Sequence, residues 1–231
     1  MNVTILPDAD AVAEQAASFI AAAARAAHSA RGRFTFAVSG GHTPWQMLRA
    51  LAHEEVPWAQ VHVFQVDERV APAGDPDRNL THLRESLLSH APLPPEQIHP
   101  MSVEDADLNA AAARYARTLA EYAGTPAVLD LIHLGLGPDG HTASLVPGDA
   151  VLAVTDVDVA LTGGTYQNRR RMTLTYPVLN RARQILWVVT GAEKVDALRK
   201  LRAADSSIPA GRVNQAHATV LADRAAAGQT A

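Results

Sequence analysis

The segment 128–148, VLDLIHLGLGPDGHTASLVPG, decides the fold class of this chain. Residues 128–134 form a nearly continuous apolar run, which is typical of a parallel strand that is covered on both faces. Its one imidazole, His133, is expected to be a core residue rather than a metal ligand. The glycine-rich loop 135–148 then follows at the carboxyl end of the strand, where open α/β sheets bind their ligands.

The start of this loop, Gly135–Gly140, matches the G-x-G-x-x-G pattern of dinucleotide-binding proteins. In those proteins the glycines begin a long crossover helix. Here only the six residues 141–146 precede Pro147-Gly148, which is too few for such a helix. An acidic residue, Asp156 or Asp158, lies about where a ribose-binding carboxylate would be. A nicotinamide- or flavin-dependent enzyme is therefore an alternative that the missing helix argues against.

Short apolar runs alternate with helical patterns along the rest of the chain. Strands are predicted at 34–38, 61–66, 128–134 and 185–190, and helices near 8–30, 44–54, 80–90, 105–123 and 191–203. This alternation predicts an α/β fold with a mostly parallel sheet. Residues 1–231 are expected to form a single domain, and the small, polar segment after Ala225 is expected to fray.

Composition excludes several function classes. The chain has no cysteine, so disulfides, cysteine-ligated zinc and thiol nucleophiles are excluded, and a reducing, cytoplasmic location is expected. A net charge of −4 gives no indication of a nucleic-acid partner. The alanine-rich run 11–27 contains Glu14 and Arg25, so an amphipathic helix is expected rather than a signal peptide or a membrane span.

The segment Ser39–Pro44, SGGHTP, joins a predicted strand to a predicted helix. Thr43 is expected to be the N-cap of that helix, with Pro44 in its first turn. Gly40 and Gly41 would let the backbone approach a ligand closely and would expose N–H groups in front of a helix N-terminus, as in an anion site. An ordinary turn that merely requires glycine is the alternative.

Charged residues follow the strand 61–66. Its carboxyl end continues into Asp67-Glu68-Arg69. A guanidinium there is able to clamp a phosphate with two hydrogen bonds, and the Asp67 carboxylate to orient a sugar hydroxyl or act as a base. A solvated strand end with a local ion pair is the alternative.

Two residues of the glycine loop could perform acid–base chemistry. The imidazole of His141 is suited to taking a proton from water, and Asp139 is close enough in sequence to orient it. Metal binding is not expected, because the ten histidines form no H-x-H or H-x-x-x-H pair. Further cations, Arg169–Arg171 and Lys194, lie near predicted strands and would suit a small phosphorylated ligand, although surface arginines are the alternative.

Taken together, these stretches resemble the 6-phosphogluconolactonase family. The matching pieces keep the family's order over nearly the whole chain: SGGHTP (39–44), DERVAP (67–72) with the Asn79 region, LGLGPDGHTASLVPG (134–148), RMTLT (171–175), TGAEK (190–194) and SIPAGRV (207–213). The resemblance implies a modified Rossmann-like sheet with helices on both faces. It also implies hydrolysis of 6-phospho-D-glucono-1,5-lactone to 6-phosphogluconate, the second step of the oxidative pentose phosphate pathway.

The resemblance also implies roles for individual residues. His141 would be the general base, with Asp139 supporting it. The phosphate and the sugar would be bound by Gly40, Gly41, Thr43, Asp67, Arg69, Asn79, Gly137, Arg171 and Lys194. No cofactor or metal is implied, and the partner is a small-molecule sugar phosphate lactone. We expect no membrane or nucleic-acid partner, and a monomer or small homo-oligomer.

The chain departs from the family pattern at two places. Many members carry Lys-Pro-Pro before the strand that matches RMTLT, whereas this chain has Thr165–Arg170, so the loop is expected to differ in shape. Val146 replaces a usual Phe. The related glucosamine-6-phosphate deaminases continue the glycine loop into Asn-Glu-Pro, and Ser144–Pro147 lacks that carboxylate. A non-catalytic sugar-phosphate sensor is a further alternative, and the presence of His141 argues against it.

Overall fold

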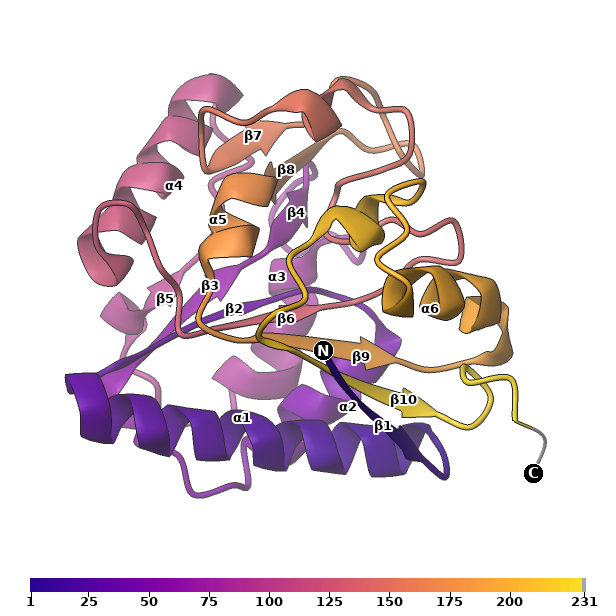
Figure 1. Ribbon diagram of the computed structural model, residues 1–231. Helices are drawn as coiled ribbons and strands as arrows, with labels where there is room; N and C mark the ends of the chain where they lie inside the picture. The colour runs from indigo at the N-terminus through magenta and orange to yellow at the C-terminus, as the bar shows by residue number, and fades with distance from the viewer. Residues whose placement is uncertain (230–231) are drawn as a thin grey trace.

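The computed structural model describes residues 1–229, and its central feature is a seven-stranded, wholly parallel sheet (Figure 1). Its strand order is β1-β10-β9-β6-β2-β3-β5. The strands are β1 (Asn2–Leu6), β2 (Phe34–Val38), β3 (Val61–Gln65), β5 (Ile98–His99), β6 (Leu131–Leu134), β9 (Ile185–Val189) and β10 (Ala218–Asp223). The predicted mostly parallel α/β fold is confirmed.

Helices cover both faces of this sheet, as predicted (Figure 1). One face carries α1 (Ala9–Arg31), α2 (His42–Leu51) and α3 (Asn79–Leu83), which continues as a π-helical turn over Arg84–Leu88. The other carries α4 (Leu108–Ala123), α5 (Tyr176–Arg181) and α6 (Val195–Arg202). Short 3₁₀ turns span Trp58–Gln60, Pro95–Gln97, Ala150–Ala153, Ala192–Lys194 and Pro209–Arg212.

Alternating side chains of the central strands enter the two cores. In β9, Leu186 and Val188 pack toward α1 and α2, whereas Trp187 and Val189 pack toward the opposite helices. All of them are almost completely buried, which explains why this run is continuously apolar in sequence. His133 lies in β6 with no exposed surface, and its Nδ1 accepts the Ser39 N–H at 3.3 Å. Burial lowers the pKa of His133 to about 3, so it is a neutral core residue.

Helix α1 fits closely onto the sheet because its buried stripe consists mainly of alanine. Asp8 caps its N-terminus by accepting the Ala11 N–H at 2.9 Å. Gly32 ends the helix in a left-handed conformation, with φ of 73°.

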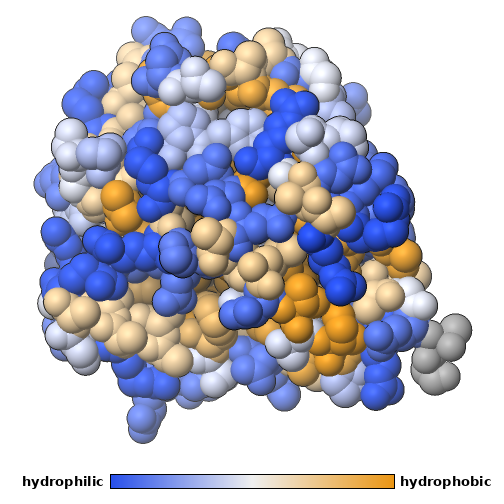
Figure 2. Space-filling model, viewed as in Figure 1, coloured by the Kyte–Doolittle hydropathy of each residue, from blue (hydrophilic) through white to orange (hydrophobic). Residues whose placement is uncertain are grey.

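Within residues 1–229, no helix is both long and apolar enough to cross a membrane. Figure 2, viewed as Figure 1, shows strongly apolar residues at the lower right, over the sheet edge formed by β1 and β10.

A second, antiparallel sheet was not predicted. It contains β4 (Asp67–Arg69), β8 (Arg171–Leu174) and β7 (Val159–Leu161) in the order β4-β8-β7. Its apolar side chains join the core under α4 and α5, so the two sheets pack as one domain. The prediction that Asp67–Arg69 is the end of the strand 61–66 is therefore wrong. The chain leaves the large sheet after Gln65, and the three residues pair with β8.

The described part of the C-terminal segment is ordered, contrary to the predicted fraying. Ala226 is buried, and its N–H donates to the Asp223 carboxylate at 2.7 Å. The Gln229 N–H donates to the Arg224 carbonyl at 2.9 Å, which closes the turn. The prediction for residues 230–231 falls outside the described residues.

Candidate active site

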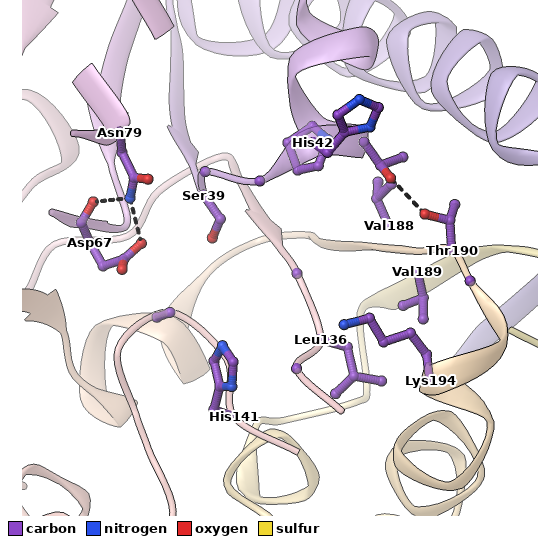
Figure 3. A pocket seen from close by; sticks show the side chains of 18 of the residues that line it. Ser39, His42, Asp67, Asn79, Leu136, His141, Val188, Val189, Thr190 and Lys194 are labelled. Atoms are coloured by element: carbon purple, nitrogen blue, oxygen red, sulfur yellow. Dashed lines mark hydrogen bonds between the residues drawn. The ribbon is translucent and has the colours of Figure 1, made fainter. Parts of the chain in front are cut away.

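A cavity of about 570 Å³ opens at the carboxyl ends of the central strands. Its walls come from the segments after β2, β6 and β9, and from the small sheet (Figure 3). Parallel α/β sheets bind ligands at this edge because the connections there diverge to opposite faces. All of the predicted phosphate and sugar residues line this cavity, namely Gly40, Gly41, Thr43, Asp67, Arg69, Asn79, Gly137, Arg171 and Lys194. His141 lines it too.

The predicted acid–base pair is formed within the glycine loop. The Gly137 N–H donates to the His141 carbonyl at 2.8 Å and closes a tight turn. This turn brings the Asp139 Oδ1 within 2.6 Å of His141 Nδ1, and the same oxygen accepts the His141 backbone N–H at 3.1 Å. Asp139 therefore fixes the tautomer with hydrogen on Nδ1 and leaves Nε2 as the basic nitrogen.

Electrostatics favour the ionised form of Asp139. Partial burial would raise the pKa of this carboxyl group. The hydrogen bonds and charge of His141 outweigh burial and lower the pKa below its usual value. The carboxylate is thus able to stabilise the positive charge that His141 acquires when it takes a proton.

Gly137 provides the space in which this pair lies. A Cβ atom at Gly137 would fall 2.0 Å from His141 Nδ1 and 2.7 Å from Asp139 Oδ1. Both distances are far shorter than any van der Waals contact, so no other residue fits at this position with the pair in place. The glycine loop is therefore built around His141, and no long helix follows it as a dinucleotide fingerprint would require.

A buried polar network forms the wall beside the small sheet. Asn79 Nδ2 donates to the Asp67 carbonyl and side chain at 2.9 and 3.2 Å. Ser144 Oγ donates to the other Asp67 oxygen at 2.6 Å. Arg171, only 3% exposed, lies 3.8 Å from the same carboxylate. Asp67 is thus fixed on three sides, which suits a residue that orients a ligand.

Two guanidinium groups lie next to each other in this wall. Arg69 and Arg171 are directly opposed in the antiparallel register of β4 and β8. Burial lowers the pKa of Arg171, the Asp67 charge opposes this shift, and Arg69 adds to it. The Arg69 Nε atom is buried without a hydrogen-bond partner among the described residues. Like charges held together in this way favour an anionic group in the adjacent cavity.

The opposite end of the cavity is formed by the start of α2 and by the segment after β9. Figure 3 shows Lys194 and Thr190 across the cavity from Asp67 and Asn79. The predicted N-cap role of Thr43 is wrong, because the helix begins at His42 and Gly41 is the capping residue. The Thr43 hydroxyl instead lies 2.6 Å from the Thr190 hydroxyl and joins the two segments.

Close packing explains one further glycine. A Cβ atom at Gly40 would fall 2.0 Å from Asn79 Oδ1, so the turn after β2 lies directly against the polar wall.

The Lys194 ammonium group lies 3.6 Å from Glu193, a distance at which its charge is only partly neutralised. The start of α2 with Gly40 and Gly41, the hydroxyls of Thr43 and Thr190, and the Lys194 cation all line this end of the cavity, and these are groups that suit an anion.

Sequence reasoning missed several residues of this site. Ser144, Thr190 and Gln167 line or support the cavity, and Tyr166 contacts His141. Glu68, fully buried, accepts the N–H groups of Asn79 and Leu80 and so fixes the start of α3. Ser144, Thr190 and Glu68 lie within the quoted motifs, but their roles depend on partners elsewhere in the chain, namely Asp67, Thr43 and the start of α3. In residues 1–229, no group of three or more His, Cys, Asp or Glu side chains could hold a metal ion.

Comparison with known proteins identifies the family. A family model for glucosamine-6-phosphate isomerases/6-phosphogluconolactonase matches residues 7–222. The chain belongs to this family. A 6-phosphogluconolactonase of Mycobacterium tuberculosis is 38% identical, covering 99% of this chain and 98% of the relative. The resemblance seen in the sequence motifs is thereby confirmed.

Solved structures agree with the fold. The 6-phosphogluconolactonase of Thermotoga maritima superposes with a TM-score of 0.86 at 26% identity, covering 96% of this chain and 98% of that one. A monomeric glucosamine-6-phosphate deaminase has a TM-score of 0.85 at 19% identity, with full coverage of both chains. Because lactonases and a deaminase share the fold, the function has to be argued from the site.

Proposed function

We propose that this protein hydrolyses 6-phospho-D-glucono-1,5-lactone to 6-phospho-D-gluconate, the second step of the oxidative pentose phosphate pathway. One observation carries the proposal: the imidazole of His141, held through Nδ1 by Asp139 at 2.6 Å, borders a cavity with cationic groups at both ends. The names of the relatives, which are 6-phosphogluconolactonases, support the same substrate.

The proposed reaction begins with proton transfer. His141 Nε2 takes a proton from a water molecule while the water oxygen attacks C1 of the lactone. Asp139 stabilises the imidazolium that forms. The tetrahedral intermediate then breaks its bond between C1 and the ring oxygen, and His141 returns the proton to that oxygen. The product is an open-chain acid, and no covalent bond to the enzyme is formed.

This chemistry requires only a few groups. A δ-lactone is an activated ester, so a base, an oriented substrate and some stabilisation of the oxyanion are sufficient. The fixed Asp67 and Asn79 side chains would hold sugar hydroxyls. Binding of the distant phosphate would supply free energy for orienting C1 near His141.

The two cationic ends are proposed to have different roles. Arg171 packs against Tyr166, whose ring also contacts His141, so Arg69 and Arg171 belong to the reacting end of the substrate. There they would stabilise the oxyanion and the product carboxylate. The phosphate would then lie at the other end, between Gly41, Thr43 and Lys194. This assignment moves Arg69 away from the phosphate, where its sequence motif had placed it.

The purified protein is expected to accelerate hydrolysis of freshly prepared 6-phosphogluconolactone without added metal or nucleotide. The same preparation should release no ammonia from glucosamine 6-phosphate, because Ser144–Pro147 provides no carboxylate for the ring-opening step. Both rates are measured against their spontaneous backgrounds. Lactone hydrolysis at the background rate would reject the proposal, and ammonia release would favour a deaminase.

Replacing Lys194 with methionine is expected to raise KM for the phosphorylated lactone about 10- to 100-fold, the loss typical of one hydrogen bond to a charged group. Activity on unphosphorylated D-glucono-1,5-lactone should not change. Lys200→Met is the matched control, because Lys200 pairs with Asp196 on the surface of α6, outside the cavity. An equal effect of Lys194→Met on both lactones would remove this residue from the phosphate site.

A further inference from the structure

A tight turn beside the cavity, Tyr166–Arg169, belongs to the loop that departs from the family pattern. The Tyr166 N–H donates to the Arg169 carbonyl at 3.0 Å, and the Arg169 N–H donates back at 3.3 Å. The two central residues, Gln167 and Asn168, have φ values of 53° and 60°. Asparagine often adopts this left-handed conformation, whereas glutamine seldom does. A turn with this unfavourable backbone conformation is stable only where contacts with neighbouring residues hold it in place.

The guanidinium group of Arg171 supports this turn through three contacts. One guanidinium nitrogen, Nη2, donates to the Gln167 side-chain oxygen at 2.9 Å and to the Tyr166 carbonyl at 3.3 Å. The same guanidinium lies 5.0 Å from the centre of the Tyr166 ring, within the range of a cation–π contact. Since Arg171 is itself buried in β8, the Tyr166 ring has a rigid support.

The other side of Tyr166 faces the acid–base pair. Its ring packs against the His141 imidazole in a T-shaped contact, with centroids 5.1 Å apart and planes inclined by 62°. Its hydroxyl oxygen lies 3.4 Å from both His141 Nδ1 and Asp139 Oδ2. Because the Nδ1 hydrogen already binds Asp139 Oδ1, the phenol is the donor to Oδ2. Burial and the Asp139 charge raise the pKa of Tyr166 against the effect of Arg171, which keeps the phenol protonated.

We propose that Tyr166 is a positioning residue for the reaction. Its ring and hydroxyl hold the Asp139–His141 pair in the orientation that directs Nε2 into the cavity. Asp139 and Gly137 lie on the same short loop as His141 and would move with it, whereas Tyr166 fixes the imidazole from another part of the chain. The inference rests on the proposed lactonase function and deepens it.

Two substitutions separate the hydroxyl from the ring. Tyr166→Phe keeps the ring and its contact with Arg171, and we expect kcat to fall about three- to tenfold, the effect of losing one long hydrogen bond, here the 3.4 Å contact with Asp139. Tyr166→Ala removes the ring as well, and we expect a loss of about 10- to 100-fold. KM for the lactone should stay close to that of the wild type in both variants, because Tyr166 does not line the cavity.

Tyr122→Phe is the matched control. Tyr122 packs against His62 and His99, away from the cavity, and loses the same hydroxyl. Its kcat should equal that of the wild type. Thermal unfolding of all variants shows whether any loss of kcat follows from a loss of stability.

The decisive measurement introduces Tyr166→Phe into the His141→Ala variant. A residue that acts through His141 has no effect once the imidazole is absent, so the residual rate should not fall further. The same fractional loss in both backgrounds would overturn the proposal, as would wild-type kcat in both Tyr166 variants. If the wild-type protein itself failed to accelerate lactone hydrolysis, the proposed function would fail first, and the role of Tyr166 with it.

Discussion

Replacing His141 with alanine is expected to lower kcat for lactone hydrolysis about 10²- to 10⁴-fold, the usual contribution of a general base. His141 is the only side chain among the described residues that combines a place on the cavity wall with a carboxylate bound to its Nδ1. The phosphate and sugar contacts remain, so 6-phosphogluconate should still bind. Turnover is measured against the spontaneous rate, and product binding by calorimetric titration.

Two controls define the role of the imidazole. His53→Ala removes an exposed histidine outside the cavity and should leave turnover unchanged. Asp139→Asn keeps the size of the side chain but removes the charge that favours the imidazolium. Its loss of kcat should therefore be larger than that of His53→Ala and smaller than that of His141→Ala. Turnover close to the wild-type value in His141→Ala would exclude this residue as the base.

The large sheet could be predicted because each of its central strands is recognisable from its own amino-acid sequence. Segments such as Phe34–Val38 and Ile185–Val189 are buried on both faces, and a short run of apolar residues in the sequence is typical of such a strand. The edge strand β1 and the final strand β10 were missed. Length is not the reason, because β1 is as long as Phe34–Val38 and β10 is longer. The residues of β1 are exposed or only partly buried, and β10 begins with Ala218 and ends with Asp223, so their pairing depends on contacts distant in sequence.

In the candidate site, too, the sequence did not reveal contacts between segments that are distant in the chain, as the small sheet shows. The motif at Asp67–Arg69 indicated charged ligand-binding residues, and Asp67 and Arg69 do line the cavity, whereas Glu68 is buried behind it. What sequence could not give is the antiparallel pairing with β8, which places Arg69 opposite Arg171. The role of Ser144 follows from the same packing, since its hydroxyl reaches Asp67 from 77 positions away in the chain. Local patterns therefore identified which residue types form the site, and tertiary contacts determined their partners.

Replacing Gly137 with alanine is expected to lower kcat by about 10² or more, since a displacement of about 1 Å at a catalytic group is able to cause a loss of this size. The φ value of Gly137 is not positive, so the backbone accepts alanine. The effect comes from the new methyl group, which would overlap His141 Nδ1 at 2.0 Å and Cε1 at 2.2 Å. The imidazole must rotate or shift, and its Nε2 then no longer faces C1 of the lactone.

A second glycine and a double variant make this prediction specific. Gly164→Ala is the control, because a Cβ there meets only Asp149 at 3.8 Å and lies outside the cavity. It should retain wild-type kcat. In Gly137→Ala/His141→Ala the overlap with the imidazole is gone, so kcat should match that of His141→Ala alone, and part of any lost thermal stability should return. If Gly137→Ala kept wild-type turnover, or if the double variant lost far more than His141→Ala, the glycine would not act by making room for the base.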